Sequence, residues 1–324
     1  MDITTSNSKR MVIVSGRAHM ALAEEVAELL GTKLIPTTAY DFANGETFVR
    51  YEESVRGVDA FVIQSHASGI NNWVMEQLLM VDAMKRASAK RITVVAPFFP
   101  YARQDKKHKG REPISARLMT DLFKTAGANR LMAVDLHTPQ IQGFFDGPVD
   151  HLWALPTLAD YIAGKYEADN LTVVSPDSGR VRVADIWAER LGTPLAIIHK
   201  RRDPDRPNQV EAHELVGNVK GRVCLLVDDM IDTGGTIVAA AQALKDNGAS
   251  KVIVAATHAV FSHPAVERLS SGVVDEVVVT NTLPITADKD FAQLTVLSIA
   301  PLIAAAISAV FGDDSVNKLF PGHA

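Results

Sequence analysis

The chain is 324 residues long, which favours two domains, because a single hydrophobic core stops growing at about 250 residues. Apolar residues make up 47% and charged residues 22%, the composition of an ordinary globular protein. The net charge of −5 argues against a general nucleic-acid binder, which carries a strong basic excess. The lone cysteine, Cys224, excludes an internal disulfide and a cysteine-cluster metal site, and the N-terminus lacks an apolar signal core; both features favour a reducing cytoplasm.

The first half of the chain alternates between apolar β-branched runs and a segment of helical period. Residues 72–87 are predicted to form a helix, because Val74, Leu78 and Val81 share one face with Met75 and Leu79 beside it. The predicted strands are 11–16, 59–65, 91–98 and 131–136.

The second half repeats this alternation. Helices are predicted over 178–191, ended by Gly192, and over 237–246. Cys224 lies inside one of the apolar runs and is expected to be buried. The predicted strands are 171–176, 194–200, 222–229, 251–258 and 276–282.

The apolar stretch 294–311 reaches the lower length limit of a membrane-spanning helix. Pro301 divides it, however, so a strand followed by a helix with proline in its first turn is the favoured interpretation.

The apolar β-branched runs in both halves of the chain are typical of strands buried on both faces of a parallel sheet. Their alternation with helices predicts two α/β domains, each with a mostly parallel sheet. We expect one domain over 1–153, a second over 154–302, and a tail over 303–324 that packs back on the first.

The segment 224–237, CLLVDDMIDTGGTI, carries the most specific chemistry. Its strand leads into two adjacent carboxylates, Asp228 and Asp229, which can accept hydrogen bonds from a vicinal diol. The glycine-containing loop that follows precedes a helix, and backbone N–H groups at such a helix start suit a phosphate monoester. The Walker loop G-x-x-x-x-G-K-[ST] does not occur.

This segment resembles the ribose-5-phosphate loop of the phosphoribosyltransferase superfamily. The chain is similar to ribose-phosphate pyrophosphokinases of the bacterial hexameric class in four of its segments. These are VDDMIDTGGT, DFANGE (41–46), PYARQDKKHKGREPISARL (100–118) and DLHTPQIQGFFDGPVDH (135–151). SPDSGRVRVAD (175–185) and HKRRD (199–203) extend the likeness to nearly the whole chain. The resemblance implies two phosphoribosyltransferase-like domains with the active site between them, and a homo-oligomer, a hexamer, whose ATP site includes a neighbouring subunit.

The implied activity is transfer of the pyrophosphoryl group of Mg-ATP to O1 of ribose 5-phosphate, for nucleotide, histidine and tryptophan biosynthesis. His137 and Asp177 match positions that bind Mg²⁺ with ATP, and oxygen-rich coordination is what Mg²⁺ prefers. The positions matching ATP contacts are Phe42, Asn44, Gly45, Glu46, Arg103 and Gln104. The positions matching ribose 5-phosphate contacts are Arg202, Asp228, Asp229, Asp232, Thr233, Gly234, Gly235 and Thr236.

Lys200 matches the principal catalytic lysine of the family, and Arg202 an arginine that steadies the transferring group. Phosphoryl-type transfer depends on positioning and charge neutralisation, which both side chains supply. Gln142, Asp150 and Ser315 match positions near a regulatory site, so phosphate activation and ADP inhibition are expected.

One position departs from the family pattern: Arg180 follows Gly179 where a second glycine is usual, which leaves the local backbone open. Two other enzyme-related interpretations remain, a phosphoribosyltransferase and a catalytically silent regulatory relative. The first usually has one such domain without the RQDKKHKGR and HKRRD segments, and the second is disfavoured by retention of His137, Asp177 and Lys200. A nucleotide-binding module without turnover is the least favoured.

Overall fold

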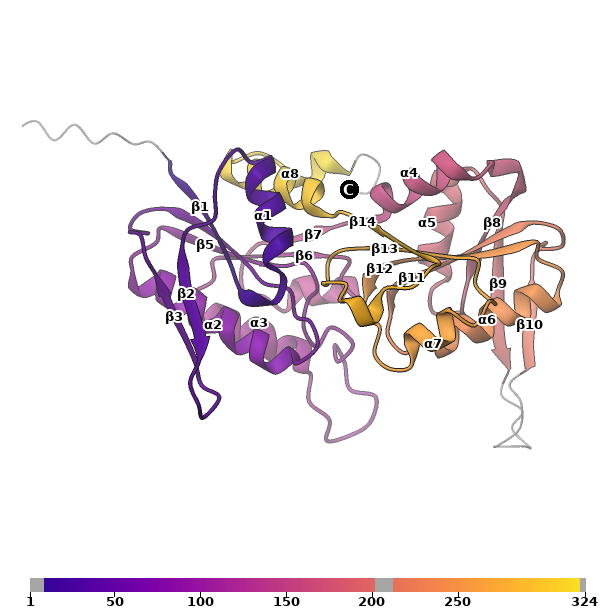
Figure 1. Ribbon diagram of the computed structural model, residues 1–324, viewed down its shortest axis with the longest axis horizontal. Coiled ribbons are helices and arrows are strands. Elements are labelled where there is room, and N and C mark those ends of the chain that lie inside the picture. Colours follow the sequence, from indigo (N-terminus) through magenta and orange to yellow (C-terminus); the bar gives the residue numbers. More distant parts are fainter. Residues whose placement is uncertain (1–8, 202–211, 321–324) are drawn as a thin grey trace, which may run out of the picture. The chain divides into compact units, whose positions relative to one another are not determined.

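The computed structural model describes residues 9–201 and 212–320, with the backbone alone at 200, 201 and 212–214. The chain forms two compact units. The first comprises residues 1–153, 282–284 and 299–324, and the second comprises 154–281 and 285–298. Both contain a central sheet with helices on its two faces (Figure 1).

The first unit is built on a parallel five-stranded sheet in the order β1-β4-β5-β6-β7. Its strands are β1 (Met11–Ser15), β4 (Asp59–Ile63), β5 (Arg91–Ala96), β6 (Arg130–Val134) and β7 (Val149–Leu152). Its helices are α1 (Met20–Leu29), α2 (Ile70–Arg86), α3 (Ser115–Ala126) and α8 (Ala300–Phe311). Helices α1 and α8 pack together on one face of the sheet, and α2 and α3 on the other (Figure 1).

A separate hairpin belongs to the first unit. Strands β2 (Thr37–Asp41) and β3 (Thr47–Tyr51) pair antiparallel with each other and form a sheet of their own. Strand β3 packs on α2, where the Tyr51 hydroxyl donates to the Met80 carbonyl at 2.8 Å. The hairpin therefore projects from the α2 side of the unit, and its far end carries residues 42–46.

The second unit has a seven-stranded sheet in the order β10-β9-β8-β11-β12-β13-β14, parallel except for β10. Its strands are β8 (Leu171–Ser175), β9 (Leu195–Arg201), β10 (Ala212–Val216), β11 (Val223–Ile231), β12 (Lys251–Ala259), β13 (Glu276–Thr280) and β14 (Leu294–Leu297). Its helices are α4 (Leu155–Lys165), α5 (Val181–Leu191), α6 (Gly235–Asp246) and α7 (Ala265–Leu269).

The burial of these strands confirms the predicted fold class. Strands β4, β8 and β13 are buried at every residue, as expected for parallel strands covered by helices on both faces. Cys224 is fully buried on β11, and burial raises the pKa of its thiol to about 11, so it is an unreactive core residue.

The apolar stretch 294–311 divides at Pro301 as expected, into β14 and α8. Among the residues that the structure describes, no helix has the length and apolar character needed to cross a membrane.

Candidate active site

The adjacent carboxylates Asp228 and Asp229 lie inside β11, not at its end as the sequence suggested. Pairing of β11 with β8 stops at Leu226, whereas pairing with β12 continues to Ile231. The two aspartates therefore stand beyond the last residue paired with β8, on the carboxyl-terminal side of the parallel strands. Ligands of open α/β sheets bind at this edge.

Arg180 lies across this carboxylate pair. Its Nη2 is 2.5 Å from Oδ1 of Asp229, and its Nε is 3.2 Å from Oδ1 of Asp228. Burial and the neighbouring Asp229 raise the pKa of Asp228, and the Arg180 guanidinium opposes that rise. Arg180 thus supplies positive charge that favours ionisation of two adjacent, largely buried carboxylates.

The loop after β11 leads directly into α6, as the sequence predicted. Gly234 has a φ of +70°, a left-handed conformation that glycine adopts without strain. Arg268 of α7 donates from Nη1 to the Thr233 carbonyl at 2.9 Å and braces the loop. The loop and the first turn of α6 present backbone N–H groups and the positive end of the helix dipole, which suits a phosphate group.

The two predicted metal-binding residues occur in different units. Asp177 follows β8, and its Oδ1 accepts hydrogen bonds from the backbone of Gly179 at 2.8 Å and of Arg180 at 3.1 Å. Its carboxylate has the oxygen chemistry of Mg²⁺, which is commonly held by one or two carboxylates together with substrate phosphates and water. His137 follows β6 and is half-buried. Within 9–201 and 212–320 no group of three or more metal-binding side chains occurs.

Four of the six predicted ATP residues form the tip of the β2–β3 hairpin. The tip is closed by hydrogen bonds from Phe42 N to the Glu46 carbonyl at 2.7 Å and from Gly45 N to the Phe42 carbonyl at 2.8 Å. The Asn44 side chain accepts from Glu46 N at 3.2 Å. Phe42 is 46% exposed, and its ring makes T-shaped contacts with the rings of Tyr40 and Phe48.

The other two, Arg103 and Gln104, lie in the loop between β5 and α3. Gln104 accepts from the Ser115 hydroxyl at 2.6 Å, and its carbonyl accepts from Ala116 N at 3.1 Å, which ties the loop to the start of α3. Arg103 is exposed.

The predicted catalytic residues are only partly described. The backbone of Lys200 belongs to β9 and pairs with His213 of β10. The side chain of Lys200 and all of Arg202 lie outside the described part of the chain.

The three predicted regulatory residues have separate local partners. Asp150 on β7 pairs with Arg130 at 2.7 Å, and burial raises the pKa of its carboxyl. Gln142 donates to the Pro139 carbonyl at 3.2 Å. Ser315 follows α8 and donates from its backbone N to Asp314 at 2.8 Å. Arg130 and Asp314 line the same cavity of about 360 Å³, so the surroundings of Asp150 and Ser315 meet there.

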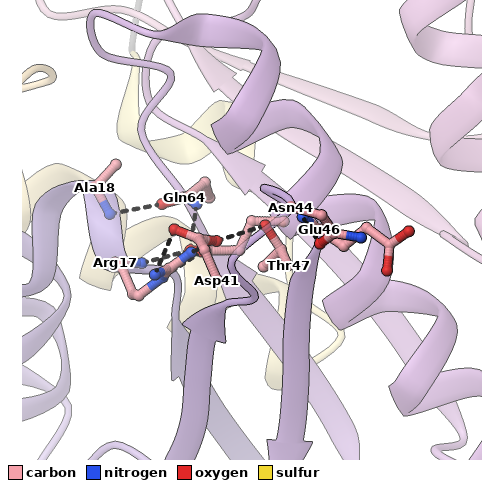
Figure 2. A network of polar contacts seen from close by, with 8 residues as sticks. Arg17, Ala18, Asp41, Asn44, Glu46, Thr47 and Gln64 are labelled. Carbon is pink, nitrogen blue, oxygen red and sulfur yellow. Dashed lines mark hydrogen bonds and ion pairs between the residues drawn. The ribbon is translucent and has the colours of Figure 1, made fainter.

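Sequence reasoning missed a polar network at the carboxyl end of β1. Arg17 pairs with the fully buried Glu76 of α2. It also pairs with Asp41 at the end of β2 (Figure 2). The available signal was an arginine immediately after a buried strand, in SGRAH (15–19). The contacts of Arg180 with Asp228 and Asp229 were also not foreseen.

Comparisons with known proteins agree with the sequence resemblance. Residues 11–127 match the N-terminal domain of ribose phosphate pyrophosphokinase, and residues 207–321 match the phosphoribosyl synthetase-associated domain. The ribose-phosphate pyrophosphokinase of Streptomyces coelicolor is 65% identical over 318 residues, covering 98% of each chain. That of Mycobacterium tuberculosis is 61% identical over 321 residues, covering 99% of this chain and 98% of its own.

A solved structure extends this agreement to the fold. The crystal structure of phosphoribosylpyrophosphate synthetase from Mycobacterium smegmatis superposes with a TM-score of 0.89 at 60% identity. The match covers 94% of this chain and all of that one. The chain therefore belongs to the ribose-phosphate pyrophosphokinase family.

Proposed function

We propose that the chain transfers the pyrophosphoryl group of Mg-ATP to O1 of ribose 5-phosphate, giving 5-phosphoribosyl 1-diphosphate and AMP. The observation that carries the proposal is the sequence of features along β11 and α6. A carboxylate pair suited to a sugar diol is followed, within one loop, by a helix start suited to a phosphate. A pentose phosphate has both groups, at the matching ends of one small molecule.

Ribose 5-phosphate binds to the second unit in this proposal. Asp228 and Asp229 accept hydrogen bonds from the ribose hydroxyls, in the ionised state that Arg180 favours. The 5-phosphate lies on the loop from Asp232 to Thr236, where backbone N–H groups and threonine hydroxyls donate to it.

ATP binds to the first unit. The exposed Phe42 ring stacks on the adenine, and the polar groups of Asn44, Gly45 and Glu46 fix its orientation. Arg103 and Gln104 reach the nucleotide from the loop after β5.

Transfer relies on positioning and charge. Lys200 and Arg202 offset the negative charge that develops on the transferred group, and Asp177 and His137 are the residues that would hold Mg²⁺. The ion, when bound, neutralises phosphate charge and makes the β-phosphorus more electrophilic.

The proposal also includes assembly, regulation and location. We infer a cytoplasmic homo-oligomer, a hexamer, in which phosphate activates and ADP inhibits at a site near Gln142, Asp150 and Ser315. The support is the family membership together with the charged cavity beside Asp150 and Ser315. Light scattering after size exclusion tests the assembly, and a phosphate titration of the rate tests activation.

The test of the reaction is a product assay with Mg-ATP and ribose 5-phosphate, followed by phosphorus NMR. Equal amounts of AMP and phosphoribosyl diphosphate are expected, and both products are lost when either substrate or Mg²⁺ is omitted. Folded protein that binds both substrates without forming AMP would identify a silent relative instead and overturn the proposal.

A further inference from the structure

The network around Arg17 fastens the hairpin tip to the body of the first unit (Figure 2). Its innermost member, Glu76 on α2, is 0% exposed. The Glu76 carboxylate accepts hydrogen bonds from Arg17 N at 2.7 Å, from Arg17 Nε at 2.5 Å, and from Gln64 Nε2 at 2.9 Å. A buried carboxylate needs such a cation and such donors, so the contact with Glu76 fixes the position of Arg17.

The outer edge of the same guanidinium faces the hairpin. Arg17 Nη2 lies 2.7 Å from Asp41 Oδ1, and Nη1 lies 3.2 Å from Asp41 Oδ2. This two-point geometry is the rigid fork that arginine offers to a carboxylate. The Arg17 side chain lowers the pKa of the Asp41 carboxyl, and the Thr47 hydroxyl adds a hydrogen bond at 2.8 Å.

Asp41 and Thr47 form the last pair of the β2–β3 ladder before the tip. Arg17 therefore contacts the hairpin next to residues 42–46, whereas the hydrogen bond between Tyr51 and Met80 holds its other end. A two-stranded sheet is marginal when it is not anchored by other parts of a fold. Without the Arg17 contact, the tip would keep its internal hydrogen bonds but lose this anchor to the rest of the unit.

The close fit at the end of β1 supports a positioning role for this contact. Gly16 N donates to the Ile63 carbonyl at 2.8 Å, and a Cβ at residue 16 would lie 2.3 Å from the Gln64 side chain. Gln64 in turn accepts from Ala18 N at 3.2 Å while it donates to Glu76. The backbone on both sides of Arg17 is therefore held, and its guanidinium has a defined direction.

We propose that Arg17 is a positioning residue for the nucleotide: through Asp41 it holds the exposed Phe42 ring and the Asn44–Glu46 turn where they meet ATP. The inference rests on the proposed function, in which the tip binds ATP. Arg17 itself is engaged by Glu76 and Asp41 and acts through the hairpin.

The test compares Asp41→Asn, Arg17→Ala and Arg17→Lys with wild-type enzyme in initial-rate assays. Loss of the Arg17–Asp41 contact is expected to raise KM for ATP about tenfold and to leave KM for ribose 5-phosphate unchanged. Arg17→Lys keeps the charge without the fork and is expected to recover part of the loss. The double variant Arg17→Ala/Asp41→Asn is expected to be no weaker for ATP than Arg17→Ala alone.

Arg50→Ala is the matched control. Arg50 lies on β3 of the same hairpin and pairs at 2.9 Å with Glu52, the residue after that strand. Its replacement removes an arginine and an ion pair from the hairpin and leaves the Arg17–Asp41 contact in place. Its KM for ATP is expected to stay within about twofold of wild type.

Three results would count against the inference. Unchanged KM for ATP in Asp41→Asn overturns it, as does an equal rise in KM for both substrates. Arg17→Ala leaves buried Glu76 without its cation and can unfold the unit, so the decision rests on Asp41→Asn, whose changed side chain is exposed. Wild-type enzyme that forms no AMP overturns the proposed function as well, whereas active wild-type enzyme with unaffected variants overturns the Arg17 inference alone.

Discussion

Nη2 of Arg180 lies 2.5 Å from Oδ1 of Asp229, and the same guanidinium reaches Asp228. Both carboxylates are largely shielded from water, with side-chain exposures of 18% for Asp228 and 10% for Asp229. This chain therefore has an internal cation at the carboxylates to which we assign the ribose hydroxyls.

Removing this cation is expected to weaken sugar binding at neutral pH. Burial and Asp229 already raise the pKa of Asp228, and Arg180→Ala removes the group that lowers it, so a larger fraction of the pair is protonated at pH 7. KM for ribose 5-phosphate is expected to rise about tenfold at pH 7 and less at pH 9, where a larger fraction of the pair is ionised. Initial rates against ribose 5-phosphate at both pH values measure this.

The control is Arg190→Ala in α5, the helix that Arg180 precedes, because Arg190 pairs with the exposed Asp160 at 2.8 Å. Equal KM values for Arg180→Ala and wild type at pH 7 would show that Arg180 does not control the ionisation of the pair.

A second prediction concerns the backbone conformation at Gly234. Alanine at φ +70° costs about 1–2 kcal/mol, and relaxing that strain shifts the N–H groups of the loop. Gly234→Ala is expected to raise KM for ribose 5-phosphate about tenfold or more with KM for ATP unchanged. Gly272→Ala is the control, since Gly272 has a φ of +88° with open space around it and is not part of the loop. Similar KM values in the two variants would refute a role for the Gly234 conformation.

A third prediction concerns Lys200 at the end of β9. Lys200→Ala is expected to lower kcat by about 10²–10³-fold, the usual effect of removing one donor to a developing charge. Ribose 5-phosphate binding, measured by calorimetry, is expected to stay near the wild-type value. Near-normal turnover in this variant would exclude the assigned catalytic role.

Regular elements were well predicted from the sequence because each is encoded by neighbouring residues. The apolar runs at 91–98 and 251–258 became β5 and β12, and Gly192 ends α5 in a left-handed conformation. The comparisons confirm the fold class, the family and the enzyme activity that the motifs indicated. The helical period of the sequence predicted the exposure of single side chains less reliably. Met75, expected beside the packed face of α2, is 53% exposed.

The β2–β3 hairpin was missed although Asn44-Gly45 is a turn signal between two strands, because the segment was interpreted only as a binding motif. The contacts that organise the site could not be predicted, since they join residues far apart in the chain. Arg17 and Glu76 are 59 positions apart, and Arg180 and Asp229 are 49 apart. Periodicity reports which face of an element is apolar, but it carries no information on which charged groups meet at the carboxyl ends of the strands.

A fourth prediction concerns Mg²⁺ and Asp177. Asparagine retains an oxygen that can accept from Gly179 N and Arg180 N but lacks the charge that Mg²⁺ requires. Asp177→Asn is expected to raise the free Mg²⁺ needed for half-maximal rate about tenfold, and a chelator is expected to abolish activity reversibly in the wild type. Asp185→Asn on the exposed side of α5 is the control. An unchanged Mg²⁺ requirement in Asp177→Asn would remove Asp177 from the metal site.

The last prediction concerns stability at low pH and depends on His66, which follows β4 and is 1% exposed. Its Nδ1 lies 2.9 Å from the Phe98 carbonyl, which can only accept a hydrogen bond, so Nδ1 carries a proton. Nε2 and the nearby buried Oε1 of Gln77 make no hydrogen bond within the described residues. Burial lowers the pKa of His66 from 6.5 to about 4.

Because the unfolded chain binds a proton at His66 near pH 6.5 and the folded chain only near pH 4, the contribution of this residue to stability is complete above pH 6.5. It is lost as the pH falls from 6.5 towards 4, by about 3 kcal/mol at most. His66→Gln keeps a donor for Phe98 but does not titrate, so its urea-unfolding midpoint is expected to fall less than that of wild type between pH 7 and pH 4.5. The carboxylates titrate equally in both proteins and cancel in this difference. Parallel losses of stability in the two proteins would mean that His66 is protonated in the folded state, against the burial that the structure shows.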